Sequence, residues 1–166
     1  RPDRSLAVQE RPRRVNGEAT PATARAAEAG GAGFRDGGCL CGAVRFRIGL
    51  PALWVAHCHC SMCRRAQGAG FVTWVGTDEK RFVVESGVDI LTRYPSSAEG
   101  SRGFCGRCGS PLFFQSSRWP GEVHVTLASL DDPSGLEPQA HAYWKSRASW
   151  LGWDGGALPT AEPDEK

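Results

Sequence analysis

The sequence lacks the features that direct a chain to membranes or nucleic acids. Its 166 residues contain no apolar run of about 18 residues, the length that a membrane-spanning helix needs. The N-terminus has no positively charged stretch followed by an apolar one, so it does not resemble a secretory signal. The 20 basic and 18 acidic residues leave a net charge of only +2. This imbalance is too small to favour a nucleic acid or a membrane surface, and we predict neither as a partner.

Common catalytic motifs are missing as well. The sequence has no Ser-His-Asp order, no phosphate-binding loop of the Walker type and no complete glycine pattern for a dinucleotide. Helical periodicity is scarce, with single turns of helix expected only after Cys63 and near residues 129–133. The function must therefore be sought in other residues.

What the sequence does contain is a series of short strand-like runs. Val44, Phe46 and Ile48 alternate with Arg45 and Arg47, which is typical of a half-buried strand. Similar runs, separated by Gly, Pro, Ser or Asp, occupy residues 53–58, 71–76, 81–86, 89–94, 111–115, 122–128 and 139–144. The pattern predicts a mainly β fold built of short antiparallel sheets.

Large apolar side chains are concentrated in the middle of the chain. Residues 1–33 have six Arg, four acidic residues and many Ala, Gly and Pro. Such a segment buries too little surface to offset the entropy lost on ordering. We predict a disordered or loosely packed arm at 1–33, a folded domain at 34–158 and an acidic tail at 159–166.

The seven cysteines form three close-set groups, which core cysteines would not do. Such spacings are typical of metal ligands in a reducing compartment rather than of a disulfide framework, so we predict a cytoplasmic location. The groups are Cys39-x-Cys41, Cys58-x-Cys60-x-x-Cys63 and Cys105-x-x-Cys108.

Zinc prefers four ligands in a tetrahedron, and this number divides the cysteines into two sites. Cys105 and Cys108, followed by Gly109, resemble a zinc knuckle that needs two further ligands, and Cys39 and Cys41 supply two. The remaining three thiolates match a zinc site whose fourth position is open to water or substrate.

Two histidines lie close to the three-thiolate group in sequence. His57 could close that site as Cys₃His, which would make it merely structural. His59 lies between two of the cysteines, and in an extended chain its side chain would point away from both. We favour the open site, and the closed one remains an alternative. His124 and His141 are expected to be structural, and Trp144, Trp150 and Trp153 to pack the closing segment.

Four stretches together carry a family resemblance: "GGCLCGAVRF", "HCHCSMCRRAQGAGF", "FCGRCGSPLFF" and "HAYWKSRASWLGWDGGALP". They occur in order across residues 37–159, and they resemble the glutathione-dependent formaldehyde-activating enzyme family, which also contains relatives of centromere protein V. The resemblance implies a β-tent fold with two zinc ions. It implies that Cys39, Cys41, Cys105 and Cys108 hold a structural zinc, and that Cys58, Cys60 and Cys63 hold a second, catalytic one.

The activity implied by the resemblance is a carbon–sulfur lyase reaction on glutathione adducts, such as S-(hydroxymethyl)glutathione formation from formaldehyde and glutathione. A zinc with three thiolates is a weak Lewis acid, so thiolate exchange is easier to defend there than water activation. Among the basic residues Arg64, Arg65, Lys145 and Arg147, we choose Arg64 as the contact for a glutathione carboxylate because it adjoins Cys63.

Two other classes of function compete with this prediction. In one, both zinc ions are structural and the domain is a non-catalytic interaction module, although the mixed charge of the N-terminal arm gives little attraction to phosphate. In the other, the chain is a methionine sulfoxide reductase, which needs a further nucleophilic cysteine that the two sites do not leave. We favour the enzyme, with its exact substrate and oligomeric state undetermined.

Overall fold

The computed structural model describes residues 33–152 and 154–163, and the fold there is mainly β. A three-stranded sheet has the order β1-β2-β5, and an eight-stranded sheet has the order β11-β10-β3-β4-β9-β8-β7-β6. The strands are β1 Phe34–Gly38, β2 Arg45–Gly49, β3 Trp54–Cys58, β4 Val72–Asp78, β5 Phe82–Ser86, β6 Leu91–Pro95, β7 Gly100–Cys105, β8 Pro111–Ser116, β9 Glu122–Thr126, β10 Ala140–Ala142 and β11 Thr160–Ala161.

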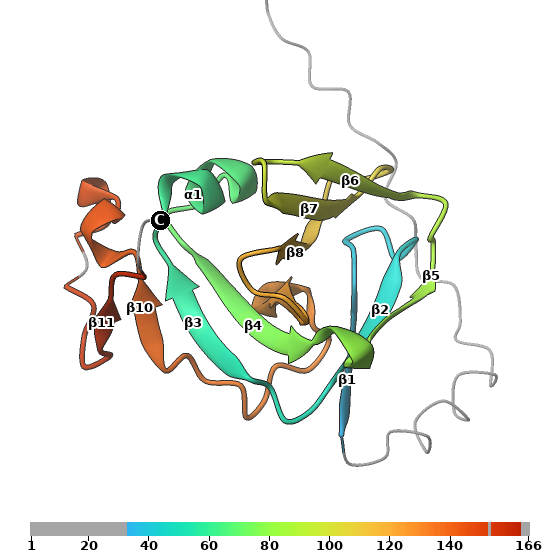
Figure 1. The fold of residues 1–166 in the computed structure, drawn as a ribbon, viewed down its shortest axis with the longest axis horizontal. Helices are drawn as coiled ribbons and strands as arrows, with labels where there is room; N and C mark the ends of the chain where they lie inside the picture. The colour runs from blue at the N-terminus through green and yellow to red at the C-terminus, as the bar shows by residue number, and fades with distance from the viewer. Residues whose placement is uncertain (1–32, 153, 164–166) are drawn as a thin grey trace, which may run out of the picture.

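Helical structure within residues 33–152 and 154–163 is limited to short segments. The α-helix α1 covers Ser61–Gln67 and ends at Gly68, which adopts the left-handed conformation that glycine tolerates best. The 3₁₀ turns are η3 Glu79–Arg81, η4 Leu127–Ser129, η5 Trp144–Ser146 and η6 Ser149–Leu151. In Figure 1, α1 lies above the end of β3 at the top of the view, and β1 lies in the lower part. None of the helices in the described ranges is long and apolar enough to cross a membrane.

The prediction of a mainly β fold is confirmed, and the eight predicted runs each contain a strand. One detail is corrected: the sheets are not wholly antiparallel, because β10 pairs in parallel with both β3 and β11. The chain reaches β10 through the long connection after β9, residues 127–139, which crosses past β4 and β3. It therefore arrives beside β3 in the same direction, as a crossover connection allows.

The core lies between the two sheets. Val55, Val75 and Val125 are directly paired across β3, β4 and β9, and they are almost fully buried on the face that turns toward the small sheet. Phe46 and Ile48 of β2 pack against this face from the other side. Because successive side chains of a strand point to opposite faces, the residues between these valines lie on the outer face of the large sheet.

The two ends of the predicted domain can be compared with the described residues. The expected N-terminal arm lies outside the described residues except for Gly33, so its order stays a prediction. Beyond Leu158, Thr160 and Ala161 form β11 and pair with β10. Strand pairing therefore continues past the limit that the sequence suggested for the domain.

Candidate functional site

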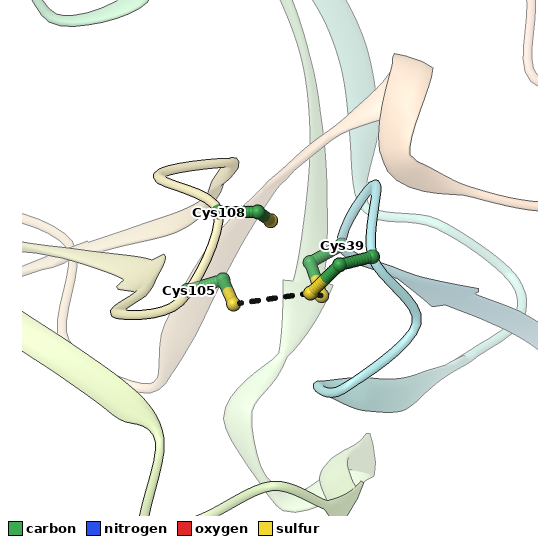
Figure 2. A group of neighbouring side chains, drawn as sticks. Cys39, Cys105 and Cys108 are labelled. Carbon is green, nitrogen blue, oxygen red and sulfur yellow. Dashed lines mark hydrogen bonds between the residues drawn. The ribbon is translucent and has the colours of Figure 1, made fainter. Parts of the chain in front are cut away.

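Four of the cysteines meet where the two sheets adjoin. Cys39 and Cys41 lie in the β1–β2 loop, and Cys105 and Cys108 lie at the turn from β7 to β8. All four sulfurs lie within 4.8 Å of one another. Figure 2 shows Cys105 and Cys108 on one turn facing Cys39 on the other. The predicted grouping of these cysteines is therefore present in the fold.

The geometry of this group fits a tetrahedral zinc site. A zinc ion about 2.3 Å from each sulfur would hold the sulfurs about 3.8 Å apart. The Sγ–Sγ distance is 3.5 Å between Cys39 and Cys41 and 3.9 Å between Cys41 and Cys105. The backbone N–H of Val44 donates to Cys39 at 3.2 Å. Such donors stabilise a thiolate ligand.

The surroundings of Cys108 also favour a thiolate that could bind a metal ion. The side chain and backbone of Ser110 lower the pKa of Cys108 to about 5. Ser110 Oγ also accepts a hydrogen bond from the backbone N–H of Leu40 at 3.0 Å, which links the two cysteine-bearing loops. Because one loop belongs to the small sheet and the other to the large sheet, an ion held here would join the sheets.

The second group consists of Cys58, Cys60 and Cys63. Cys58 ends β3, Cys60 precedes α1 as its N-cap, and Cys63 lies in the first turn of the helix. Cys58 and Cys63 are buried, and Cys60 is half-buried. The backbone N–H of Cys63 donates to the sulfur of Cys60 at 3.3 Å, so the tight turn between strand and helix orients these thiols.

The electrostatics of this group favour a bound cation. Hydrogen bonds from the thiols of Cys58 and Cys60 lower the pKa of Cys63 to about 2, and the nearby Arg102 guanidinium contributes. Hydrogen bonding with the thiols of Cys60 and Cys63 raises the pKa of Cys58. Three thiols so close together cannot all ionise unless a positive charge compensates them. The donor set suits zinc, and the guanidinium would offset the net negative charge of a three-thiolate ion.

The histidines beside these cysteines lie away from the sulfurs. Among the described residues, the ligand atoms grouped with the sulfurs belong only to Cys58, Cys60 and Cys63. His57 Nδ1 lies 2.9 Å from Thr73 Oγ1, and His59 Nε2 lies 2.8 Å from His141 Nδ1. The prediction that His59 would point elsewhere agrees with this geometry. The structure therefore does not favour closure of the second site by His57.

The three thiols line a pocket of about 450 Å³ on the outer face of the large sheet. This volume is typical of sites for small molecules. Arg102 and Arg118 line the pocket together with five aromatic side chains: Trp54, Trp74, Phe114, Trp119 and Tyr143. The pocket therefore combines sulfur, positive charge and apolar surface.

Strand register places one continuous row of residues along the wall of this pocket. Trp54, Gly76, His124, Phe114 and Arg102 are successive partners across β3, β4, β9, β8 and β7. The absence of a side chain at Gly76 lets the indole of Trp54 lie over β4, since a Cβ there would be 2.4 Å from the ring. The row is thus built by pairing between distant segments of the chain.

Glu122 holds two members of this row in place. Its Oε2 accepts hydrogen bonds from Trp54 Nε1 and from His124 Nε2, both at 3.0 Å. The two rings meet edge to face, with centroids 4.6 Å apart. His124 is buried, which lowers its pKa despite the opposing effect of Glu122. The expectation that His124 is a residue of a strand face agrees with its place on β9, and that face borders the pocket.

The predicted substrate contact lies elsewhere. Arg64 is on α1, its Nε donates to the carbonyl of His59 at 3.1 Å, and it is not among the residues that line the pocket. The role of Arg64 as a carboxylate contact stays a prediction, and its place outside the pocket does not favour that role. Arg102 occupies the better position, since its Nη2 lies 3.6 Å from Cys63 Sγ. Sequence reasoning missed Arg102 because it is 39 residues from Cys63, and no local spacing connects them.

Each of the seven cysteines belongs to one of the two groups. No cysteine is left over as the separate nucleophile that a methionine sulfoxide reductase needs. The expectation drawn from counting thus agrees with the arrangement of the sulfurs.

Comparison with known proteins gives a consistent result. The family model described as glutathione-dependent formaldehyde-activating enzyme matches residues 34–146. A protein of Halomonas elongata that bears this family's name is 32% identical over 124 residues, which are 70% of this chain and 78% of that protein. An uncharacterized lyase of Schizosaccharomyces pombe is 32% identical over 79 residues, 48% of this chain and 56% of its own length.

A solved structure extends the likeness to the fold. The crystal structure of a Rhodobacter sphaeroides protein has a TM-score of 0.53 and 26% identity, and the match covers 76% of this chain and 99% of that one. The sequence match, the fold and the ordered cysteine groups lead to one conclusion: the chain belongs to the glutathione-dependent formaldehyde-activating enzyme family.

Proposed function

We propose that this protein is a zinc-dependent enzyme of the carbon–sulfur lyase type that acts on adducts of glutathione with an aldehyde. The reaction by which formaldehyde and glutathione form S-(hydroxymethyl)glutathione is the simplest example. The observation that carries the proposal is the pocket in which the thiols of Cys58, Cys60 and Cys63 lie beside two arginines. Membership of the family supports the same class of substrate.

We assign different roles to the two cysteine groups. Cys39, Cys41, Cys105 and Cys108 would hold a structural zinc that joins the sheets of a β-tent fold. Cys58, Cys60 and Cys63 would hold a second zinc, which would supply a site for the glutathione sulfur, bound as thiolate when it carries no aldehyde carbon. With three protein ligands, the coordination shell at this second site leaves one position for that sulfur.

The chain's own residues would orient the rest of the substrate. Arg102 is half-buried and packs over the ring of Phe114 at 5.0 Å, so its guanidinium is held in a fixed position. Arg118 packs over the ring of Trp119 at 5.5 Å and also lines the pocket. Charge-assisted hydrogen bonds to a carboxylate are among the strongest polar contacts. Glutathione has two carboxylates, and we propose that these arginines bind them while the aromatic side chains limit water around the sulfur.

Cobalt substitution tests the proposal. Cobalt(II) would replace zinc in both cysteine groups, and addition of glutathione should change the thiolate charge-transfer and d–d bands of the second site only. A Cys60→Ser variant should lose this change while keeping the bands of the other site. Unchanged spectra at millimolar glutathione would refute the proposal and would favour two structural ions in an interaction module.

A pair of arginine variants tests the carboxylate contact. Arg102→Ala should weaken glutathione binding by about 1.5–3 kcal/mol, the value of a hydrogen bond to a charged group. Arg64→Ala removes the same charge from α1, outside the pocket, and should leave the affinity nearly unchanged. Equal effects of the two substitutions in calorimetric titrations would contradict the role given to Arg102.

A further inference from the structure

The apolar part of the pocket is much longer than a one-carbon unit. Cys58 and Trp54 are four residues apart on β3, which corresponds to about 13 Å along a strand. Ala56 lies between them on the same face, beside its partner Trp74 on β4. An apolar surface therefore runs from the thiols past Trp74 to Trp54, and we call these two rings with Ala56 and Phe114 the aromatic wall.

The wall is held in place by contacts of its own. Glu122 fixes the indole N–H of Trp54, and Trp74 is only 5% exposed beside Phe114, with ring centroids 6.4 Å apart. A preformed site costs little ordering when a ligand binds. Because rigid aromatic surfaces in a pocket gain most from contact with another apolar or aromatic group, the wall is suited to bind one.

The carbon of formaldehyde would not contact the aromatic wall. Once joined to the sulfur, its single carbon would stay beside Cys58, Cys60 and Cys63, and the rings farther along β3 and β4 would contact nothing of the substrate. The guanidinium of the row lies at the other end from Trp54, where Arg102 follows Phe114. Glutathione would thus lie toward the arginines, and a substituent on its sulfur would extend along the wall.

We propose that the adduct bound by this protein carries a large apolar, preferably aromatic, substituent on the glutathione sulfur. This inference rests on the proposed function, since it requires that glutathione bind at the second cysteine group. It narrows the substrate class to adducts of aldehydes or other electrophiles several carbons in length.

Substituted glutathiones measure the preference directly. Glutathione, S-methylglutathione, S-hexylglutathione and S-(4-nitrobenzyl)glutathione would be titrated by calorimetry against the zinc-loaded protein. The hexyl and nitrobenzyl compounds should bind at least about tenfold more tightly than the methyl compound, because each buried methylene and ring adds apolar contact. The nitrobenzyl group should also quench tryptophan fluorescence, which reports its position beside the indoles.

Three variants test whether the aromatic wall causes the preference for large substituents. Trp54→Ala shortens the wall, and Ala56→Leu fills the surface between Trp54 and Cys58 without removing any packing. Each should reduce the preference for the hexyl and nitrobenzyl compounds about tenfold while the affinity for S-methylglutathione changes little. Trp150→Phe is the matched control, because Trp150 is 72% exposed and does not line the pocket. It should behave as the wild type does.

The outcomes separate the two proposals. If glutathione and S-methylglutathione bind but the larger compounds bind no more tightly, the inference about the substituent is overturned and the proposed function stands. If none of the four compounds binds, the proposed function fails and this inference fails with it. A preference that survives both Trp54→Ala and Ala56→Leu in folded protein would place the substituent elsewhere and overturn the inference.

Discussion

Replacing Gly76 with alanine tests how tightly the pocket wall is packed. Gly76 on β4 is the direct partner of Trp54 on β3. A Cβ at this position would lie 2.4 Å from Cε2 and 2.5 Å from Nε1 of the indole. Nonbonded atoms do not approach so closely, so Trp54 must move. Its hydrogen bond to Glu122 and its edge-to-face contact with His124 would then weaken together.

The expected loss of stability follows from these contacts. Inserting a methyl group into a packed region costs about 1–3 kcal/mol. The hydrogen bond to Glu122 is worth about 1 kcal/mol and the ring contact with His124 about 0.5–1.5 kcal/mol. Because the ring keeps part of each contact after it moves, we expect the free energy of unfolding to fall by about 2–4 kcal/mol.

Urea unfolding measures the change. With a slope of about 2 kcal/mol per molar urea, the middle of the usual range, the midpoint of Gly76→Ala should fall by about 1–2 M. The matched control is Gly103→Ala, in which the new Cβ would lie 2.3 Å from the ring of Phe113. Gly103 also faces its strand partner, but on the core side of the large sheet. It should destabilise the fold to a similar extent.

The two variants should differ in binding. Gly76→Ala displaces a ring of the pocket and should weaken S-(4-nitrobenzyl)glutathione, whereas Gly103→Ala should leave its affinity unchanged in the folded protein. A Gly76→Ala protein with the urea midpoint and ligand affinity of the wild type would refute the tight packing of Trp54 over β4.

Three further predictions concern the metal sites and the buried histidine. Cys105→Ser should abolish the cooperative melting transition, because a structural zinc contributes folding free energy of the order of the whole stability. A well-folded variant with two zinc ions per chain by elemental analysis would contradict this prediction. Cys60→Ser should keep the fold and lower the zinc content from two ions to one, and loss of its melting transition would mean that both sites are structural. Burial lowers the pKa of His124, so the neutral ring stabilises the fold above about pH 6.5 and this contribution declines as the pH falls below that value. An NMR titration of its ring protons should give a midpoint below 6.5, shifted lower still by Glu122→Gln, and a midpoint above 6.5 would show that the attraction of Glu122 outweighs the effect of burial.

The division of the cysteines into four and three is a counting argument, and the fold arranges the sulfurs in that way. Counting succeeds because metal ligands are supplied in short local groups, and their number is limited by the coordination of the ion. Zinc binding and the role of each cysteine remain predictions. The family resemblance, in contrast, is confirmed by the family model and by the relative from Halomonas elongata.

Local pattern also determined where most strands lie, because apolar side chains that alternate along a run must share one face. It could not identify β1, β7 or β11, whose sequences are FRDGG, GSRGFC and TA. Glycine and polar residues have little strand preference of their own. These segments are extended because neighbouring strands offer them hydrogen-bond partners, as β6 and β8 do for β7.

The sequence by itself thus determined the β class, the two cysteine groups and the family. Only the tertiary structure decided what surrounds the second group. Trp54, His124, Phe114 and Arg102 lie in one row because four separate strand pairings bring them into register. A shift of one residue in any of these pairings would turn a side chain to the other face. Register depends on contacts between segments far apart in the chain, so no local motif could have placed Arg102 beside Cys63 or Arg64 outside the pocket.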